Sequence, residues 1–116
     1  MQRKTIAIIL LVLGLAFVFG VFGIGKFQDP LLWIGWMPPW MDGFLGLPAS
    51  SWLRITGIGE ILLAILLLIP VRALQRIIVI FMSLHLLAVL TQTGWNDIAV
   101  RDIGLLLSCL SLLFLL

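Results

Sequence analysis

Four long apolar runs dominate this sequence and leave little room for a soluble fold. They cover residues 5–25, 53–69, 77–93 and 98–116. Crossing about 30 Å of hydrocarbon takes about 20 helical residues, and each run is close to that length. Only 10% of the residues are charged, whereas an ordinary soluble domain carries about 25%. The sequence therefore predicts one all-α domain over residues 1–116, an antiparallel bundle of four transmembrane helices in the lipid bilayer.

All five tryptophans lie outside these runs, where they mark the level of the lipid headgroups. They are Trp33, Trp36, Trp40, Trp52 and Trp95. Residues 27–51 are long and apolar, but Pro38 and Pro39 block a continuous helix through them. We expect a short surface helix and a turn between the first two spans, lying flat in the headgroup layer. This segment serves as a lipid anchor or, alternatively, as a lid over an inner site or a dock for another subunit.

The charged residues predict how the bundle is oriented. One end carries four basic residues with no acid beside them, namely Arg3, Lys4, Arg72 and Arg76. The other end carries Lys26, Arg54 and Arg101 together with all five acids. Because Lys and Arg prefer cytoplasmic loops, we expect both termini in the cytoplasm and the tryptophans outside. The first run is too long for a cleaved signal segment, so we expect it to be an uncleaved first helix. A net charge of only +2 makes nucleic acid an unsuitable partner.

Small and polar residues recur at helical spacing, which marks the faces expected to point into the bundle. These faces hold Ala16, Gly20, Gly23 and Lys26 in the first run, Gly57, Glu60 and Ala64 in the second, His85, Ala88 and Gln92 in the third, and Arg101, Gly104, Ser108 and Ser111 in the fourth. At 1.5 Å per residue, Glu60 lies roughly 10 Å and His85 roughly 12 to 13 Å inside the helix ends. A short turn joins their helices, so we expect Glu60 and His85 to meet near mid-membrane.

Ionisable groups at such depth cost about 2.5 to 3.5 kcal/mol each on insertion scales, so they are rarely left without a partner or a role. Two interpretations stay open. One is a structural network in which Lys26, Arg101 or His85 pairs with Glu60. The other is a proton-handling or ligand site formed by Lys26, Glu60, His85, Arg101 and Asp102. A metal or haem site is not expected, because the chain has one histidine and one cysteine.

Three short motifs lie within or beside these runs. They are Gly23-Ile24-Gly25-Lys26-Phe27 followed by Asp29-Pro30, then Gly57-Ile58-Gly59-Glu60-Ile61-Leu62 leading to Arg72, and finally Arg101-Asp102. Together they resemble the DoxX-like group of small four-helix membrane proteins. The resemblance implies a bundle in a prokaryotic inner membrane, with Lys26, Glu60, Arg101 and Asp102 as the positions to carry over. It also implies a link to quinone-dependent sulfur oxidation, oxidative-stress complexes or the assembly of other membrane proteins.

We therefore expect a membrane subunit that binds a small amphiphile, with a quinone as the leading candidate, for a redox partner. Such a subunit would not be catalytic alone, because the sequence has no thiol pair and no cofactor-ligand motif. A non-enzymatic assembly or scaffold factor that uses the tryptophan-rich face is one alternative. A small proton-coupled transporter is another. The sequence leaves the oligomeric state open.

Overall fold

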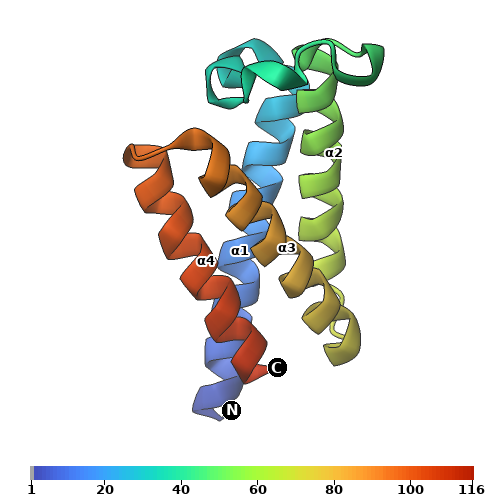
Figure 1. The fold of residues 1–116 in the computed structure, drawn as a ribbon. Helices are drawn as coiled ribbons and strands as arrows, with labels where there is room; N and C mark the ends of the chain where they lie inside the picture. The colour runs from blue at the N-terminus through green and yellow to red at the C-terminus, as the bar shows by residue number, and fades with distance from the viewer. Residues whose placement is uncertain (1) are drawn as a thin grey trace.

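Four α-helices form the body of the protein (Figure 1), which a computed structural model describes over residues 2–116 apart from the side chain of Thr93. They are α1 (Arg3–Gln28), α2 (Ala49–Leu67), α3 (Arg72–Thr93) and α4 (Asp97–Leu115). All four are long and apolar enough to cross a membrane. The predicted all-α four-helix bundle is confirmed, and the chain has the architecture of a multi-pass membrane protein.

The boundaries of the helices follow from local hydrogen bonding. α4 begins after Asn96, whose side chain accepts a 3.0 Å hydrogen bond from the amide of Ala99 and so satisfies a free N–H group. α2 ends shortly before Pro70, which has no amide to continue the helix. The buried side chain of Gln75 then donates a 3.0 Å hydrogen bond to the carbonyl of Leu67. This bond ties the start of α3 to the end of α2.

The helices pack as two pairs that diverge from one end of the bundle. α1 packs mainly on α2 and α3 mainly on α4, whereas α2 and α3 contact each other sparsely. Figure 1 shows α2 and α3 meeting at their turn and separating toward the other end. Both termini lie at the same end as this turn. The bundle is therefore closed at that end and more open at the opposite one.

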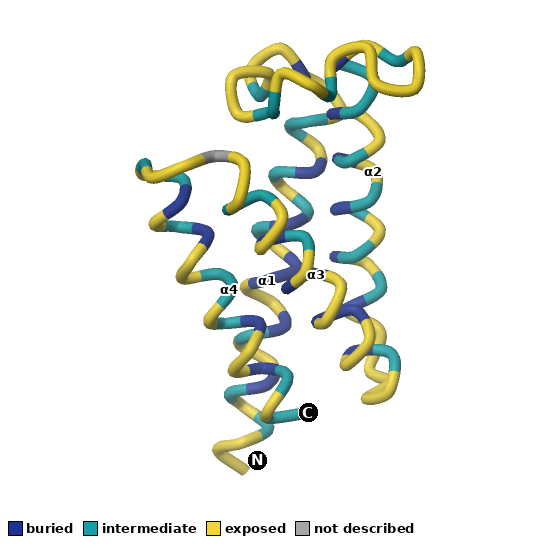
Figure 2. The backbone as a smooth tube through the Cα atoms, viewed as in Figure 1, coloured by how far each residue is buried: buried dark blue, intermediate teal, exposed yellow. Residues whose placement is uncertain are grey.

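The apolar core lies in the closed part of the bundle. Its fully buried side chains include Leu67, Val79, Met82, Cys109 and Leu112. The outward faces of all four helices are largely exposed (Figure 2) although they are apolar. An uninterrupted apolar surface of this kind is what lipid chains cover in a membrane-spanning bundle.

At the open end, the segment between α1 and α2 folds into three short 3₁₀ helices. They are η1 (Pro30–Trp36), η2 (Pro39–Met41) and η3 (Phe44–Gly46). The chain breaks at Met37 and Pro38, as the prolines predicted, and the expected short helix before the break is η1, a 3₁₀ helix of seven residues. The segment is held to α2 by the indole of Trp52, which donates a 3.0 Å hydrogen bond to the carbonyl of Phe44. It covers the ends of α1 and α2 (Figure 1).

One predicted inward face is wrong at two of its four positions. Gly104 and Ser111 of α4 are exposed, whereas Asp102 and Cys109 are buried. The helix is turned so that its bulky Leu112 fills the core. Ser108 needs no partner on another helix, because its hydroxyl donates a 2.9 Å hydrogen bond to the carbonyl of Gly104 in the same helix. A serine in lipid that is satisfied in this way gives no information about the inward face.

Candidate functional site

Three ionisable side chains from three helices meet in the open half of the bundle. The ammonium group of Lys26 donates a hydrogen bond to Oε1 of Glu60, and Nε2 of His85 lies 3.1 Å from the same oxygen. We call these three residues the charge cluster. The expected meeting of Glu60 and His85 is confirmed. The side chain of Glu60 is 5% exposed, that of Lys26 14% and that of His85 26%.

The crossing of α1 and α2 brings Lys26 and Glu60 together. At the crossing, a Cβ atom built on Gly57 would lie 2.5 Å from the carbonyl oxygen of Gly23, so the two backbones are in contact. Lys26 and Glu60 each lie three residues beyond these glycines in their helices. Side chains of a helix lean toward its N-terminus, and α1 and α2 run in opposite directions. The lysine and the glutamate therefore lean toward each other across the crossing.

A second charge pair lies at the start of α4. The guanidinium of Arg101 donates to Oδ1 of Asp102, with Nη2 at 3.2 Å and Nε at 3.3 Å. Its central carbon lies 4.3 Å from the ring centroid of Phe22, which is a cation–π contact with α1. Of the three groups predicted as partners of Glu60, Lys26 and His85 contact it, whereas Arg101 pairs with Asp102.

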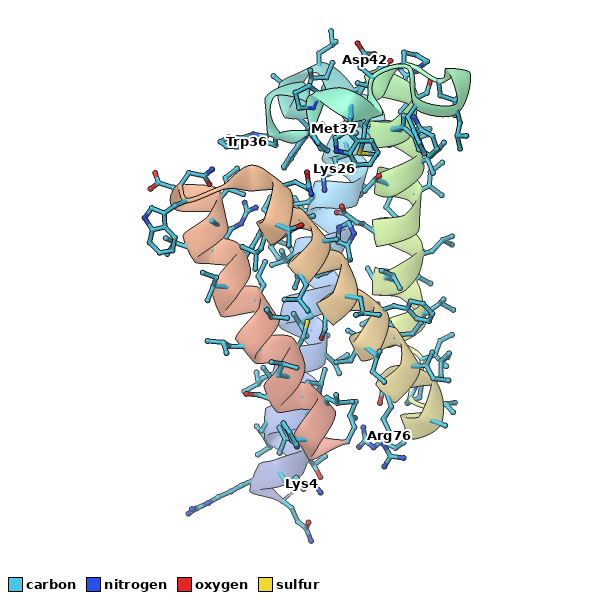
Figure 3. All side chains as sticks on the ribbon, in the orientation of Figure 1. Lys4, Lys26, Trp36, Met37, Asp42 and Arg76 are labelled. Carbon is cyan, nitrogen blue, oxygen red and sulfur yellow. The ribbon has the colours of Figure 1, made fainter. Side chains whose placement is uncertain are left out.

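A cavity of about 380 Å³ lies between the helices beneath the 3₁₀ segment. All five predicted ligand or proton residues line it, namely Lys26, Glu60, His85, Arg101 and Asp102. Aromatic side chains form much of the remaining wall, namely Phe19, Phe22, Trp33, Trp36 and Trp40. In Figure 3, Trp36 and Met37 lie on the same side of the bundle as Lys26, at the open end. The sequence thus predicted the ionisable residues of one cavity without showing that a cavity joins them.

The tryptophans divide into two groups. Trp33 lies edge-on to Phe22 with ring centroids 5.5 Å apart, and the Lys26 ammonium is 5.3 Å from its ring centroid. With Trp36 and Trp40 it lines the cavity, which agrees with the predicted alternative of a lid. Trp52 instead anchors the 3₁₀ segment, and Trp95 is 81% exposed in the turn before α4.

The sequence did not single out Phe19 or Phe22, although both line the cavity. Phe22 lies one helical turn before Lys26, so the i, i+4 rule places it on the same face. Phe19 packs beside His85 with ring centroids 6.0 Å apart. The helical spacing from Lys26 was the signal that could have found Phe22, whereas the contact of Phe19 with α3 depends on tertiary structure.

The charges that line the cavity balance. Lys26 and Arg101 contribute two positive charges, Glu60 and Asp102 contribute two negative ones, and a neutral His85 leaves the sum at zero. The cavity thus presents hydrogen-bond donors and acceptors without an excess of either sign, which favours a neutral polar head over an anion. Among residues 2–116, no three His, Cys, Asp or Glu side chains lie close enough to hold a metal ion.

No family model matches the chain, and neither a curated protein nor a solved structure matches it. The resemblance to the DoxX-like group therefore stays a prediction from short motifs. What the cavity can bind follows from its own residues.

Proposed function

We propose that the protein binds a small amphiphile in this cavity, that the amphiphile is a quinone, and that the bound quinone serves a redox partner in the same membrane. The cavity is the observation that carries the proposal. Its volume of about 380 Å³ lies within the range of roughly 300 to 1,000 Å³ that is usual for small-molecule sites. Such sites are mostly apolar with a few convergent polar groups, and this one has aromatic walls and two charge pairs.

The polar groups suit both oxidation states of a quinone. The carbonyl oxygens of the oxidised ring accept hydrogen bonds, and Lys26, Arg101 and His85 supply donors around the cavity. The hydroxyl groups of the reduced ring donate hydrogen bonds, and the carboxylates of Glu60 and Asp102 accept them. Aromatic side chains pack against a flat ring at little cost in conformational entropy. These features support a site that holds the ring in either state.

We further propose that the protein lies in a prokaryotic plasma membrane with both termini in the cytoplasm. The basic residues without acidic neighbours lie at the closed end, and Figure 3 shows two of them, Lys4 and Arg76, far from Asp42 at the open end. Lys and Arg are enriched in cytoplasmic loops, which supports this orientation. The cavity then lies in the outer half of the membrane, beneath the tryptophan-rich segment.

Tryptophan quenching tests the proposal directly, because Trp33, Trp36 and Trp40 line the cavity. The protein is reconstituted in nanodiscs without quinone and titrated with a benzoquinone. We expect saturable quenching, which His85→Ala weakens about tenfold or more in apparent Kd. The matched control is Leu87→Ala, two residues along the same helix on an exposed apolar position.

Each result of this titration has a clear meaning. Saturable quenching that Leu87→Ala preserves and His85→Ala weakens supports the site. Quenching that rises linearly with quinone in both proteins reports only partitioning into lipid and would contradict it. Mass spectrometry of the lipids that copurify with the protein then identifies the native occupant.

A scaffold or assembly factor is the second candidate, and one observation favours it. The 3₁₀ segment exposes large apolar side chains that do not line the cavity, among them Leu31, Leu32 and Leu45 at 75 to 77%. A client protein that docks there would no longer bind to the double variant Leu31→Ser, Leu32→Ser. The client would still bind to the His85→Ala variant. A quinone subunit predicts the reverse, namely that His85→Ala impairs its function and the two serine substitutions do not.

A further inference from the structure

A second, more open groove lies on the other side of the charge cluster. It runs between α2 and α3, has a volume of about 660 Å³ and is lined by five residues of α2 between Gly59 and Leu66 and by four residues of α3 between Ile78 and His85. Apart from Glu60 and His85, all the side chains that line it are apolar. Because α2 and α3 contact each other sparsely, this groove is open at its side, where the bundle faces lipid.

Glu60 and His85 line both the cavity and the groove. On α2 the cavity involves residues 53–60 and the groove involves residues 59–66. On α3 the cavity involves residues 85–92 and the groove residues 78–85. The hydrogen-bonded pair of Glu60 and His85 is therefore a wall shared by the cavity, which carries the charged groups, and the apolar groove.

Gly59 keeps the groove open next to this shared wall. A Cβ atom built on Gly59 would have no atom within 4 Å, so the space beside it is empty. From residue 59 to residue 66 the groove follows α2 for roughly 10 Å at 1.5 Å per residue. A chain of several methylene groups fits along such a length, whereas a second polar ring would find no hydrogen-bond partner beyond Glu60 and His85.

We propose that this groove holds the hydrocarbon tail of the amphiphile whose head occupies the cavity. The inference rests on the proposed function and narrows its ligand to a quinone with one linear tail, which lies between α2 and α3. The adjacency of the two spaces, which share Glu60 and His85 in their walls, supports this occupant, since a head held by the charge cluster lies next to the groove. The tail also stays in surroundings as apolar as the lipid that it leaves.

The test fills the groove and compares two ligands with the same ring. Gly59→Leu places a side chain in the empty space, and Gly14→Leu is the matched control, because a Cβ atom there also meets nothing within 4 Å but lies outside the groove. The ligands are a tail-less benzoquinone and the same ring with a decyl tail. Tryptophan quenching in nanodiscs measures both affinities.

We expect Gly59→Leu to weaken binding of the decyl quinone about tenfold and to leave the tail-less ring unchanged. Gly14→Leu should change neither affinity. If Gly59→Leu fails to fold, Leu84→Phe narrows the groove from α3 without adding a tryptophan, with Leu87→Phe at an exposed position as its control. Loss of both ligands together, or of neither, would overturn the tail site.

Three other outcomes are distinguishable from these. If the wild type binds neither the tail-less nor the decyl quinone, the proposed function fails, and the tail site fails with it. If the wild type is a dimer and Gly59→Leu makes it monomeric, a second copy of the chain fills the groove and the tail does not. If the wild type binds the tail-less ring and the decyl ring equally, the function stands and the tail site is wrong.

Discussion

The close crossing of α1 and α2 gives the sharpest test of how this bundle positions its charge cluster. Gly57→Ala adds one methyl group at the contact. The new Cβ atom would lie 2.5 Å from the carbonyl oxygen of Gly23, 3.0 Å from the amide nitrogen of Phe27 and 3.1 Å from Cβ of Lys26. Two of these three atoms belong to the backbone, so a side-chain rotation cannot relieve the overlap. The helices have to separate.

Gly59→Ala on the same helix is the matched control, because its added Cβ atom meets nothing within 4 Å. Both variants replace a helical glycine by alanine, which favours the helix by roughly 0.8 to 1 kcal/mol. This propensity gain cancels when the two variants are compared. Overpacking costs typically about 1 to 3 kcal/mol, so Gly57→Ala should unfold more easily than Gly59→Ala by that amount.

Thermal unfolding in detergent measures the difference. With a shift on the order of 4 °C for each kcal/mol, the two melting temperatures should differ by about 4 to 12 °C. Gly57→Ala should also weaken quinone quenching, since the separation changes the shape of the cavity that α1 and α2 both line, whereas Gly59→Ala leaves the crossing unchanged. A Gly57→Ala protein that melts at or above the temperature of Gly59→Ala would refute the close crossing.

Two further predictions concern the ion pair and the orientation. In a double-mutant cycle followed by unfolding in detergent, Glu60→Gln should lower the free energy of unfolding by about 3 to 5 kcal/mol, because it leaves a buried ammonium without its counter-charge. Adding Lys26→Met to the same chain should recover part of this loss. Strictly additive losses would show that the two residues are independent. In intact cells, an impermeant thiol reagent should label Asp97→Cys but not Ala73→Cys, with the fully buried Cys109 silent in both proteins, and the opposite labelling would reverse the proposed orientation.

The helices could be predicted from the sequence because their signals are local. An apolar run of about 20 residues specifies a span without reference to any other part of the chain. The meeting of Glu60 and His85 could also be predicted, since a short turn makes α2 and α3 antiparallel neighbours and depth then follows from counting residues. Pro38 likewise predicted where the outer segment breaks.

The rest of the site depends on how the helices are rotated and tilted, which no local pattern fixes. Small residues on α4 suggested a face through Gly104, Ser108 and Ser111. Lipid, however, accepts a glycine, or a serine bonded within its own helix as Ser108 is, as readily as a neighbouring helix does. The pairing of Arg101 with the adjacent Asp102 was also missed, because the sequence offered Glu60 as an equally good partner for Arg101. The groove beside Gly59 arises from the divergence of α2 and α3, which only the assembled fold shows.

We expect two residues of the charge cluster to have different roles: Lys26 stabilises the fold, and His85 contributes to ligand binding. Glu60 accepts hydrogen bonds from two partners, and the ammonium of Lys26 is the less exposed of the two. His85 is 26% exposed and lies at the boundary between cavity and groove. His85 can therefore turn from Glu60 to hydrogen-bond a ligand without leaving the carboxylate unpaired, because Lys26 still neutralises it. Substitution of Lys26 should then lower mainly the free energy of unfolding, and substitution of His85 should lower mainly the affinity for the ligand. The carboxylate of Glu60 therefore serves both the fold and the site.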